Sequence, residues 1–375
     1  MSCLAIIGPA HPLRGGIAEH TAGVAETASR MGHVVDVFSY SRQYPSLLFP
    51  GRTQFETESA SRRADYRVHA VLDSLWPPSW QGLGNRLRTS GTEAVLLQRW
   101  HPFFAPALAT VARRVRDRAR IVWMVHNARP HEDRALWRPL LTLGMHPGDL
   151  CLVHADAERD ALAELGVTST IRRIPMPARG VVERQDPAEA RARLGFSEGE
   201  IVFLFFGHVR AYKGVEVLLE ALSLLDASGP AWKAVLAGEW YVDRSSAEAT
   251  VARAGLGEQV RIDDRFVPGG DLADYFAAST VVVLPYVSGS QSAVIPLAYA
   301  HGRAVVTTRV GGLPESVEEG ETGWIVPPSN PAALAAALEQ IRRGRRASPA
   351  AIERKLAQHS FATLVDAIVR PVDLP

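Results

Sequence analysis

Short apolar runs alternate along the chain with longer segments in which apolar residues recur every three or four positions. In the first half the apolar runs are residues 4–7, 34–38, 94–97, 121–125 and 149–153. Continuous apolar runs of this length are typical of parallel strands that are buried on both faces. The segments 17–31, 106–118 and 156–165 have helical spacing, as crossover helices require. This half is therefore predicted to form a doubly wound α/β domain.

The same alternation begins again after residue 200. Its apolar runs are residues 201–206, 234–237, 260–262, 281–285 and 304–308, and its clearest helical segments are 215–225 and 272–278. Residues 175–195 between the two series are polar and punctuated by proline and glycine, which is typical of a linker. A chain of 375 residues is long enough for two domains of ordinary size. We expect two similar α/β domains with a ligand site in the cleft between them.

Composition narrows the class of protein. Charged residues make up 22% of the chain and the net charge is +1, so the basic excess that nucleic-acid binding requires is missing. The two cysteines, Cys3 and Cys151, lie among apolar neighbours, which predicts buried free thiols in a reducing compartment. No segment has the run of about 18 apolar residues that a spanning helix needs, and no secretion signal is recognisable. These features predict a cytoplasmic protein without a nucleic-acid partner.

The segment 206–214, Phe-Gly-His-Val-Arg-Ala-Tyr-Lys-Gly, has the strongest chemical signal. A predicted strand ends at Gly207, and Arg210 and Lys213 follow just before a predicted helix. Lys213 is one of three lysines in a chain that otherwise takes its positive charge from arginine. A helix N-terminus offers free N–H groups and a partial positive charge, to which these side chains add two full charges. We interpret the segment as a diphosphate site that needs no metal; the alternative is a turn whose basic residues face water.

Two loops of the first half follow predicted strands in the same way. In residues 9–17 the pair Gly15-Gly16 lets the backbone approach a ligand closely, although such a pair also solves a tight turn. His126 follows the strand at 121–125, and ligands gather at the carboxyl ends of strands in doubly wound sheets. We predict that His126 touches the substrate as a hydrogen-bond donor or proton carrier, a structural histidine being the alternative.

Polar and aromatic residues after two other strands are further candidates for ligand contact. Trp100 and His101 follow the strand at 94–97, in a segment where Phe103 and Phe104 are expected to pack under the loop. Trp100, His101 and His131 are the candidates for contact with a second, acceptor ligand. In the second half the loop after residue 285 offers hydroxyl, amide and backbone donors at Ser290, Gln291 and Ser292. Capping of the next helix is the alternative role of this loop.

Five segments together resemble glycosyltransferase family 4: Arg14-Gly15-Gly16, residues 207–214, Leu284-Pro285-Tyr286, residues 310–315 and residues 320–327. They extend over most of the chain. The resemblance implies the GT-B fold, in which two Rossmann-like doubly wound domains face a central cleft. It implies an acceptor-binding domain at residues 1–180, joined by a C-terminal helix at about 358–375, and a donor-binding domain at residues 181–357. It also implies metal-independent transfer of a sugar from a nucleotide-sugar to a hydroxyl of a glycan, lipid or small molecule, with retention of anomeric configuration.

The resemblance further implies roles for single residues. The catalytic residues would be His126, Arg210 and Lys213. The donor would also meet Gly15, Gly16, Gly207, Glu239, Phe266, Val267, Ser290, Gln291 and Ser292, with Glu239, Phe266 and Val267 beside the nucleobase. No cofactor and no metal are expected, since Arg210 and Lys213 would stabilise the departing diphosphate and the chain has no Asp-X-Asp motif.

One departure from the family leaves the activity open. Many members have two glutamates, for the sugar and the ribose, at positions that here hold Gly289 and Leu297. Neither side chain accepts a hydrogen bond, so the small polar residues at 290–292 are the hypothetical substitutes. Two alternatives therefore stand beside the transferase. They are a nucleotide-sugar 2-epimerase-like enzyme, which would need paired acidic residues, and a non-catalytic subunit that binds nucleotide-sugars.

Two arginine-rich segments suggest a further partner. The first contains Arg113, Arg114, Arg116, Arg118 and Arg120, and the second contains Arg342, Arg343, Arg345 and Arg346. Such segments bind anionic lipid in some proteins, which predicts peripheral contact with the inner face of a membrane. A solvated helix face is the alternative.

Overall fold

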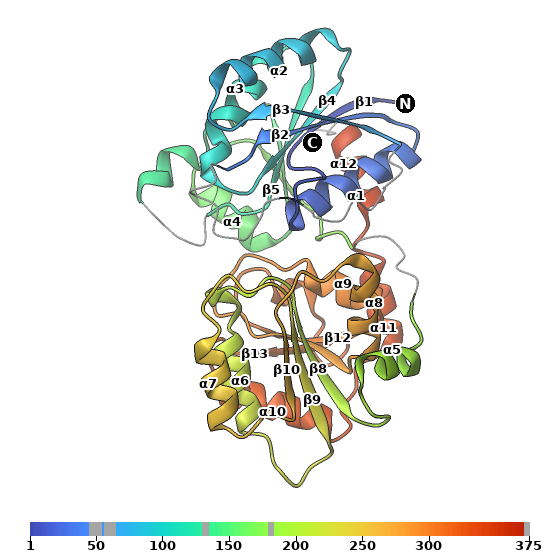
Figure 1. Cartoon of the computed structure of the whole chain (residues 1–375). Coiled ribbons are helices and arrows are strands. Elements are labelled where there is room, and N and C mark those ends of the chain that lie inside the picture. The colour runs from blue at the N-terminus through green and yellow to red at the C-terminus, as the bar shows by residue number, and fades with distance from the viewer. Residues whose placement is uncertain (45–54, 56–64, 130–134, 179–183, 371–375) are drawn as a thin grey trace. The chain divides into compact units, whose positions relative to one another are not determined.

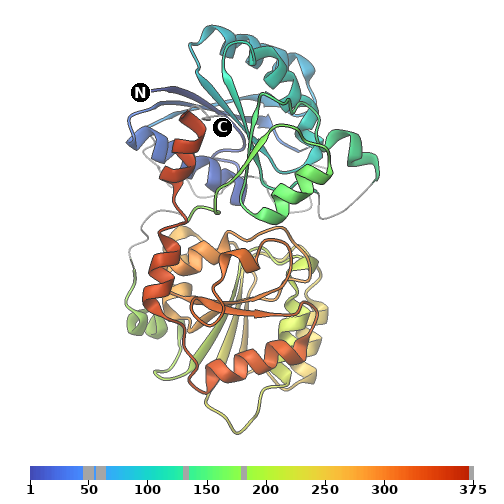
Figure 2. The same ribbon diagram turned by 180° about the vertical axis from the view of Figure 1, so that it is seen from behind.

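The computed structural model describes residues 1–44, 55, 65–129, 135–178 and 184–370 (Figure 1). The chain divides into two compact units, unit 1 with Met1–Pro177 and Ser360–Pro375 and unit 2 with Ala178–His359. Unit 1 is therefore discontinuous in sequence, and the chain passes from α11 (Pro349–Leu356) of unit 2 to α12 (Phe361–Val369) of unit 1 (Figure 2). The limits predicted from the sequence lie at 180 and 358, and the acceptor and donor roles of the units stay a prediction.

In its described part, unit 1 has a seven-stranded parallel sheet of order β3-β2-β1-β4-β5-β6-β7. The strands are β1 (Cys3–Ile7), β2 (Val34–Arg42), β3 (Arg67–Asp73), β4 (Ala94–Arg99), β5 (Arg120–Val125), β6 (Leu150–Val153) and β7 (Thr170–Arg173). The helices besides α12 are α1 (Gly16–Arg30), α2 (Pro77–Thr89), α3 (Ala105–Val115) and α4 (Asp156–Glu164), with the 3₁₀ helices η2 (Pro102–Phe104) and η3 (Ala135–Leu140). In register, Ile7 of β1 lies beside Phe38 of β2 and Leu97 of β4.

Unit 2 repeats the plan with a six-stranded parallel sheet of order β10-β9-β8-β11-β12-β13 in its described residues. Its strands are β8 (Ile201–Phe206), β9 (Trp232–Ala237), β10 (Val260–Asp263), β11 (Val281–Leu284), β12 (Ala304–Thr308) and β13 (Gly323–Val326). Its helices besides α11 are α5 (Pro187–Leu194), α6 (Val215–Ser223), α7 (Ser245–Arg253), α8 (Gly269–Ala278), α9 (Val294–Ala300) and α10 (Pro331–Arg342), with η4 (Ala211–Lys213) and η5 (Pro314–Ser316). Both sheets are thus of the doubly wound α/β type, as the sequence predicts.

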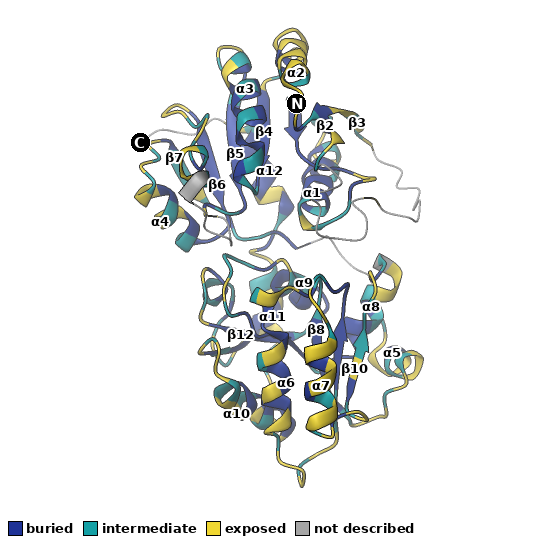
Figure 3. Ribbon diagram, turned by 60° about the vertical axis from the view of Figure 1, so that its left-hand side comes forward, coloured by how far each residue is buried: buried dark blue, intermediate teal, exposed yellow. Residues whose placement is uncertain are grey.

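The core of unit 1 occupies both faces of its sheet, because side chains alternate along a strand. Along β1, Leu4 and Ile6 belong to one buried cluster, and Ala5 and Ile7 belong to the other. The strands are accordingly buried between helices that are exposed on their outer sides (Figure 3). The last helix completes one of these clusters with residues such as Phe361, Leu364, Val365 and Ile368.

A glycine in α1 fixes how α12 packs. A Cβ at Gly23 would lie 2.3 Å from the ring of Phe361, so any larger residue would push this ring out of place. The C-terminus of α12 is also held, because the guanidinium of Arg120 donates to the carbonyls of Ile368 and Arg370. The first residue of β5 therefore satisfies carbonyls that the helix end leaves without intrahelical partners.

Three strands were not predicted from the apolar pattern. They are β3, β7 and β13, which are edge strands in their sheets. The sequence of β7, Thr-Ile-Arg-Arg, is polar, and β3 is mostly exposed, so neither has the continuous apolar run of a central strand. Residues 320–327, which carry part of the family resemblance, contain β13 at Gly323–Val326.

The linker predicted at residues 175–195 is also wrong in part, because Pro187–Leu194 form α5. Asp186 caps this helix by accepting hydrogen bonds from the backbone of Ala188 and Glu189, and Gly195 ends it in a left-handed conformation with φ 77°. Aspartate, proline and glycine here are helix start and stop signals, which resemble linker composition.

The structure tests the expectations for the two cysteines, for Phe104 and for membrane-spanning helices. Both cysteines are free; Cys151 is buried, whereas Cys3 is only partly buried, so the prediction of two buried thiols is wrong for Cys3. Phe104 is fully buried, which confirms its packing role. None of the helices in the described part of the chain is long and apolar enough to cross a membrane.

Candidate functional site

The most prominent site of unit 2 lies where the strand order reverses. β8 pairs with β9 on one side and with β11 on the other, and ligands of open α/β sheets bind at such a switch point, beyond the carboxyl ends of the strands. The loops after β8 and β11 are joined there, because the backbone N–H of Val287 donates to the carbonyl of Tyr212 at 2.9 Å. The segment that the sequence marks as a phosphate site therefore follows a switch-point strand.

Two glycines make this loop possible. Gly207 has φ 104°, and a Cβ there would lie 3.2 Å from Nζ of Lys213, so the lysine folds back over the strand end. Gly214 has φ 70°, and a Cβ there would lie 2.0 Å from the carbonyl oxygen of Pro285. A larger residue at 214 would separate the two switch-point loops, because neither the backbone conformation nor the space allows a side chain.

Lys213 is a buried cation in this loop. It is 9% exposed, and its ammonium lies 5.6 Å from the ring centroid of Tyr286. Burial lowers its pKa, the charge of Arg210 lowers it further, and Tyr212 acts in the opposite direction. No carboxylate in the described part of the chain forms an ion pair with Lys213. A buried charge is costly unless a counter-charge compensates it, so this arrangement favours an anionic ligand.

Arg210 adds a second cation at the surface of the same loop. Its guanidinium carbon lies 4.9 Å from the ring centroid of Tyr241, which also stacks with His208 at 5.1 Å. Stacking on an aromatic face holds a guanidinium in place while its N–H groups stay available. Arg210, too, has no ion pair among the residues that the structure describes.

The predicted nucleobase contacts lie beyond β9 and β10, at the same edge of the sheet. Glu239 is buried, and its carbonyl accepts a hydrogen bond from Val209 at 2.9 Å. Phe266 is 38% exposed, whereas Val267 is buried. The structure thus places an exposed aromatic ring and a buried carboxylate at the same sheet edge as residues 207–214, here called the Gly207 loop. Their contact with a base stays a prediction.

Ser292 has a local structural role in its loop. Its hydroxyl lies 3.0 Å from the hydroxyl of Tyr286 and accepts from the backbone N–H of Val294 at 3.3 Å, as a helix cap does. Ser290 and Gln291 are partly exposed, and the carbonyl of Ser290 accepts from Gly312 at 2.7 Å. The contact of these three residues with a donor stays a prediction.

In unit 1, His126 belongs to a buried cluster with His20 and His154. The ring of His20 on α1 lies 4.8 Å from that of His126 and 5.2 Å from that of His154, which follows β6. Gln98, at the end of β4, connects two of them. Its oxygen lies 2.5 Å from Nε2 of His126, and its nitrogen lies 3.2 Å from Nδ1 of His20. His126 is thus oriented by groups from three elements.

Two histidines of the cluster, His20 and His126, are neutral in the neutral pH range. Burial lowers the pKa of both His20 and His126 well below 6.5, and the neighbouring histidines lower them further. Because the amide oxygen of Gln98 only accepts, His126 has its proton on Nε2. In the described part of the chain no three His, Cys, Asp or Glu residues are arranged to hold a metal ion. The arrangement allows His126 to act as a neutral hydrogen-bond partner rather than as a charged acid.

The other predicted contacts of unit 1 have mixed positions. A Cβ at Gly15 or Gly16 would meet no atom within 4 Å, so the space above this backbone is open. Nε1 of Trp100 donates to the hydroxyl of Tyr44 at 3.1 Å. His101 accepts from the backbone of Phe103 and thereby caps η2. His131 lies outside the described residues.

Gln98, His20 and His154 were missed by the sequence reasoning. His154 follows the apolar run at 149–153 just as His126 follows the run at 121–125, so the same rule would have found it. His20 falls on the apolar face of its predicted helix, where a polar residue is unexpected unless it has a specific role. Gln98 directly follows the apolar run at 94–97, so the same rule would have found it as well.

Two family models match the chain. The model described as Glycosyltransferase Family 4 matches residues 14–178, and the model described as Glycosyl transferases group 1 matches residues 200–343. A D-inositol 3-phosphate glycosyltransferase of Streptomyces avermitilis is 32% identical over 196 residues, which are 50% of this chain and 40% of that protein. One of Catenulispora acidiphila is 35% identical over 164 residues, which are 42% of this chain and 39% of that protein. The chain thus spans about two fifths of the length of the curated relatives it matches.

Solved structures match over nearly the whole chain. The HepE protein of Anabaena in complex with UDP has a TM-score of 0.75 at 18% identity, covering 98% of each chain. Sucrose-phosphate synthase of Thermosynechococcus elongatus has a TM-score of 0.71 at 20% identity, covering 98% of this chain and 95% of that one. The two doubly wound units define the GT-B class of fold. Because the two family models together match most of its length, the chain belongs to glycosyltransferase family 4, a family of transferase enzymes.

Proposed function

We propose that this chain is a retaining glycosyltransferase that moves a sugar from a nucleoside-diphosphate sugar to a hydroxyl group of an acceptor. The observation that carries the proposal is the pair of cations, Arg210 and Lys213, at the carboxyl end of β8. Among the described residues neither has a carboxylate partner, and Lys213 is buried. A diphosphate would supply the missing counter-charge.

The two cations differ in a way that suits a diphosphate leaving group. Lys213 offers a compact ammonium and Arg210 a planar fork of donors, and both are held in place before the donor arrives. As the bond between the sugar and the phosphate oxygen breaks, the negative charge that develops on the diphosphate meets this fixed positive potential. We expect no metal requirement, because these charges and the N–H groups at the start of α6 take the place of a cation.

Retention follows if the acceptor approaches the face of the sugar that the diphosphate leaves. A phosphate oxygen then accepts the proton of the acceptor hydroxyl while the new bond to the anomeric carbon forms. No side chain is needed as a base, which agrees with the lowered pKa of His126, because burial makes this imidazole a weak proton acceptor. In this scheme the unprotonated Nδ1 of His126 accepts a hydrogen bond from a sugar hydroxyl and orients it.

The relatives suggest which ligands to test first. The HepE structure contains UDP, so UDP and its sugars are the first donors. The curated relatives are named for D-inositol 3-phosphate, so an inositol phosphate is the first acceptor. The acceptor is otherwise open to glycans, lipids and small molecules.

A binding experiment without divalent metal tests the donor site. Calorimetry with UDP, GDP, ADP and their common sugar conjugates, in the presence of EDTA, compares the wild type with Lys213→Met. This change removes the charge and keeps most of the aliphatic stem. Lys233→Met is the matched control, since Lys233 lies in the same unit and its Nζ donates to the carbonyl of Glu258. We expect one nucleotide to bind to the wild type and to the control, with affinity lost in Lys213→Met; equal binding by all three proteins contradicts the proposal.

Product analysis separates the transferase from its alternatives. With donor and acceptor present, NMR of the new glycosidic bond should show the anomeric configuration of the donor. Isomerisation of the donor sugar without acceptor would indicate the epimerase-like enzyme. Donor binding without turnover over an acceptor panel would indicate the binding subunit.

The missing glutamates allow a sharper test within the same loop. If Gln291 substitutes for the first glutamate, Gln291→Ala should weaken binding of the nucleotide-sugar while leaving binding of the free nucleotide unchanged. Unchanged affinity and turnover for the sugar conjugate would exclude Gln291 from the sugar site.

A further inference from the structure

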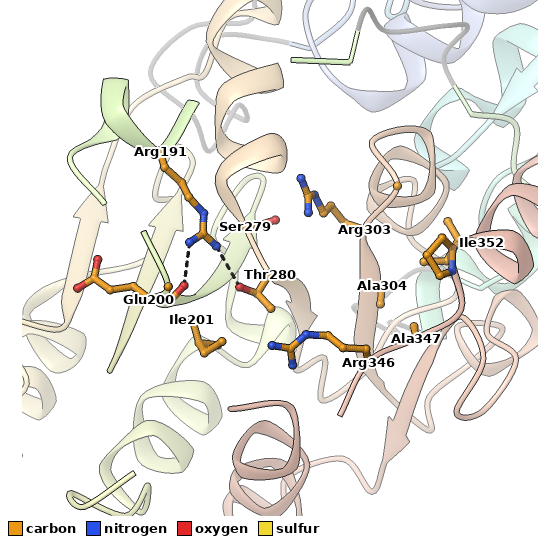
Figure 4. Close-up of a pocket in the computed structure, with 13 residues that line it drawn as sticks. Arg191, Glu200, Ile201, Ser279, Thr280, Arg303, Ala304, Arg346, Ala347 and Ile352 are labelled. Atoms are coloured by element: carbon orange, nitrogen blue, oxygen red, sulfur yellow. Dashed lines mark hydrogen bonds between the residues drawn. The ribbon is translucent and has the colours of Figure 1, made fainter. Parts of the chain in front are cut away.

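Unit 2 also has a cavity of about 500 Å³ at the amino-terminal edge of its sheet (Figure 4). Its lining includes the first residue of β8, Ile201, and Thr280 and Arg303, which directly precede β11 and β12. Because the strands of this sheet are parallel, these residues lie at the edge opposite to the Gly207 loop. The cavity is therefore distinct from the candidate donor site.

Three arginines line this cavity, and their hydrogen bonds go to uncharged groups. Arg191 donates to the carbonyl of Glu200 at 3.0 Å and faces the hydroxyl of Thr280 at 3.4 Å (Figure 4). Arg303 donates to the carbonyl of Ala277 at 2.6 Å. Its Nε is buried and has no hydrogen-bond partner in the described part of the chain. Carbonyl and hydroxyl oxygens fix these guanidinium groups in position without neutralising them.

The third arginine, Arg346, comes from the turn before α11. It donates to the carbonyl of Ile341 at 2.6 Å. As far as the described residues extend, none of the three arginines has an ion pair with a carboxylate. By contrast, Arg193 of the same unit lies 2.7 Å from Asp274. The cavity therefore concentrates uncompensated positive charge.

The acidic residue of the lining does not neutralise this charge. The carboxylate of Glu200 accepts a hydrogen bond from the backbone of Ser197 at 2.8 Å, and its side chain points away from Arg303 and Arg346 (Figure 4). The remaining wall is largely apolar, with Ile201, Ala304, Ala347, Pro349 and Ile352. A suitable ligand is thus anionic at one side and able to contact apolar surface at the other.

Nearby titratable groups report the same positive potential. Burial lowers the pKa of Arg303, and the charges of Arg191 and Arg184 lower it further. Burial also lowers the pKa of the neighbouring His301 to about 4, with Arg303 and Arg184 as the next causes. Mutual repulsion of cations raises the energy of the empty pocket, and an anion bound there would relieve it.

We propose that this cavity is a second anion site, which binds a small molecule with two phosphate groups. A phosphate carries a charge of about −1.5 to −2, so two phosphates match three arginines better than one does. Arginine is suited to this task because its planar fork donates two parallel hydrogen bonds to a phosphate. The volume of about 500 Å³ falls within the range of small-molecule pockets. This inference does not depend on sugar transfer.

Inorganic pyrophosphate is the probe, and the candidate donor site must be removed because it would bind the same probe. Calorimetry is therefore done on the full chain with Lys213→Met, without divalent metal. We expect one remaining site, which Arg303→Gln or Arg346→Gln weakens by about tenfold or more, as loss of a charged hydrogen bond does. Arg343→Gln is the control, since Arg343 is exposed and paired with Glu339 at 2.6 Å. It should change the affinity less than twofold.

The outcomes are distinct. The proposal is overturned if pyrophosphate does not bind to the Lys213→Met variant. It is also overturned if neither Arg303→Gln nor Arg346→Gln changes the affinity for pyrophosphate. Arg346 is exposed, so Arg346→Gln decides the matter if Arg303→Gln impairs folding. As an independent readout, NMR should show the pKa of His301 rising when the probe binds. Co-sedimentation of the variants with phosphatidylinositol bisphosphate vesicles then distinguishes a lipid headgroup from a soluble ligand. If the site binds a lipid headgroup, the protein sediments with the vesicles and Arg346→Gln abolishes this. If the site binds a soluble ligand, the protein does not sediment with the vesicles.

Discussion

Two basic segments of this chain, residues 113–120 of unit 1 and residues 206–214 of unit 2, use their charges in different ways. In unit 1, Arg116 lies 2.8 Å from Asp149, and Arg120 holds the carbonyls at the end of α12. In unit 2, Arg210 and Lys213 have no carboxylate partner in the described residues. The first region uses its charges to hold the fold, whereas the second keeps them available. The number of basic residues in a segment therefore says less about ligands than whether each charge already has a partner.

The peripheral membrane contact predicted from the first region loses part of its basis in the same way. Arg116 and Arg120 are engaged internally, and Arg114 donates to the side chain of Asn85 at 3.1 Å. In the other arginine-rich segment, residues 342–346, Arg342 is buried. Membrane contact stays untested, but fewer charges are free to make it than the sequence suggests.

The largest effect that the comparison predicts is on turnover. Lys213→Ala should lower kcat by about a hundredfold, because removing one preorganised donor typically costs about 3 kcal/mol of transition-state stabilisation. Thermal unfolding should change little, since in the described residues no ion pair of the fold depends on Lys213. Steady-state kinetics and calorimetric Tm measure both quantities. A normal kcat with a lowered Tm would reverse the roles assigned to the two regions.

The next effect is on stability and concerns the other region. Arg116→Ala leaves Asp149, whose side chain is 2% exposed, without its ion pair. Asp149 keeps the bond from Nε1 of Trp123 at 2.9 Å, and Arg116 is partly exposed, so the loss should not exceed about 3 kcal/mol in the free energy of unfolding. Denaturant titration measures it, with Arg113→Ala as a control that should stay within about 0.5 kcal/mol. Reduced kcat in folded Arg116→Ala would show that this region also serves catalysis.

The smallest expected effect is a pH dependence that compares the units. Burial lowers the pKa of His20 and His126 in unit 1 and that of His301 in unit 2, all below 6.5. The unfolded chain then binds protons more strongly, so stability is complete above about pH 6.5 and falls as the pH decreases below it. For His301 the decrease should end near pH 4. Urea titrations between pH 4 and 8 should show lower midpoints at acid pH, and His301→Gln should lessen the slope. A flat profile would mean that these histidines have the same pKa in the folded and the unfolded protein.

The central strands could be predicted from sequence because burial on both faces requires a continuous apolar run. The edge strands β3 and β7 could not, because they are partly exposed and lack such a run, whereas β13 is apolar and mostly buried but begins at a glycine within a glycine-rich segment. A C-terminal helix at about 358–375 was expected from the family resemblance alone, and the structure has α12 at Phe361–Val369.

The candidate site was predictable only where neighbouring residues of one loop form it. Gly207, Arg210 and Lys213 are close in sequence, so their chemistry can be inferred together. The contacts of His126 come from α1, β4 and the residue after β6, which no local pattern connects. The arginines of the second cavity come from α5 and from the segments before β12 and α11, and a sequence without contacts does not show that they meet.

The position of α12 has a consequence for synthesis on the ribosome. Phe361, Leu364 and Ile368 complete a core cluster that also contains residues of β1 and α1, yet they are translated after all of unit 2. Domains generally fold as they emerge, starting from the N-terminus. Here the first residues of unit 1 are translated before unit 2, but an apolar face of unit 1 stays uncovered until α12 has been translated. Unit 2 is therefore the first unit that can complete its folding. A ribosome-bound chain of this protein would therefore need protection, for example by a chaperone, on its earliest segment and for the longest time.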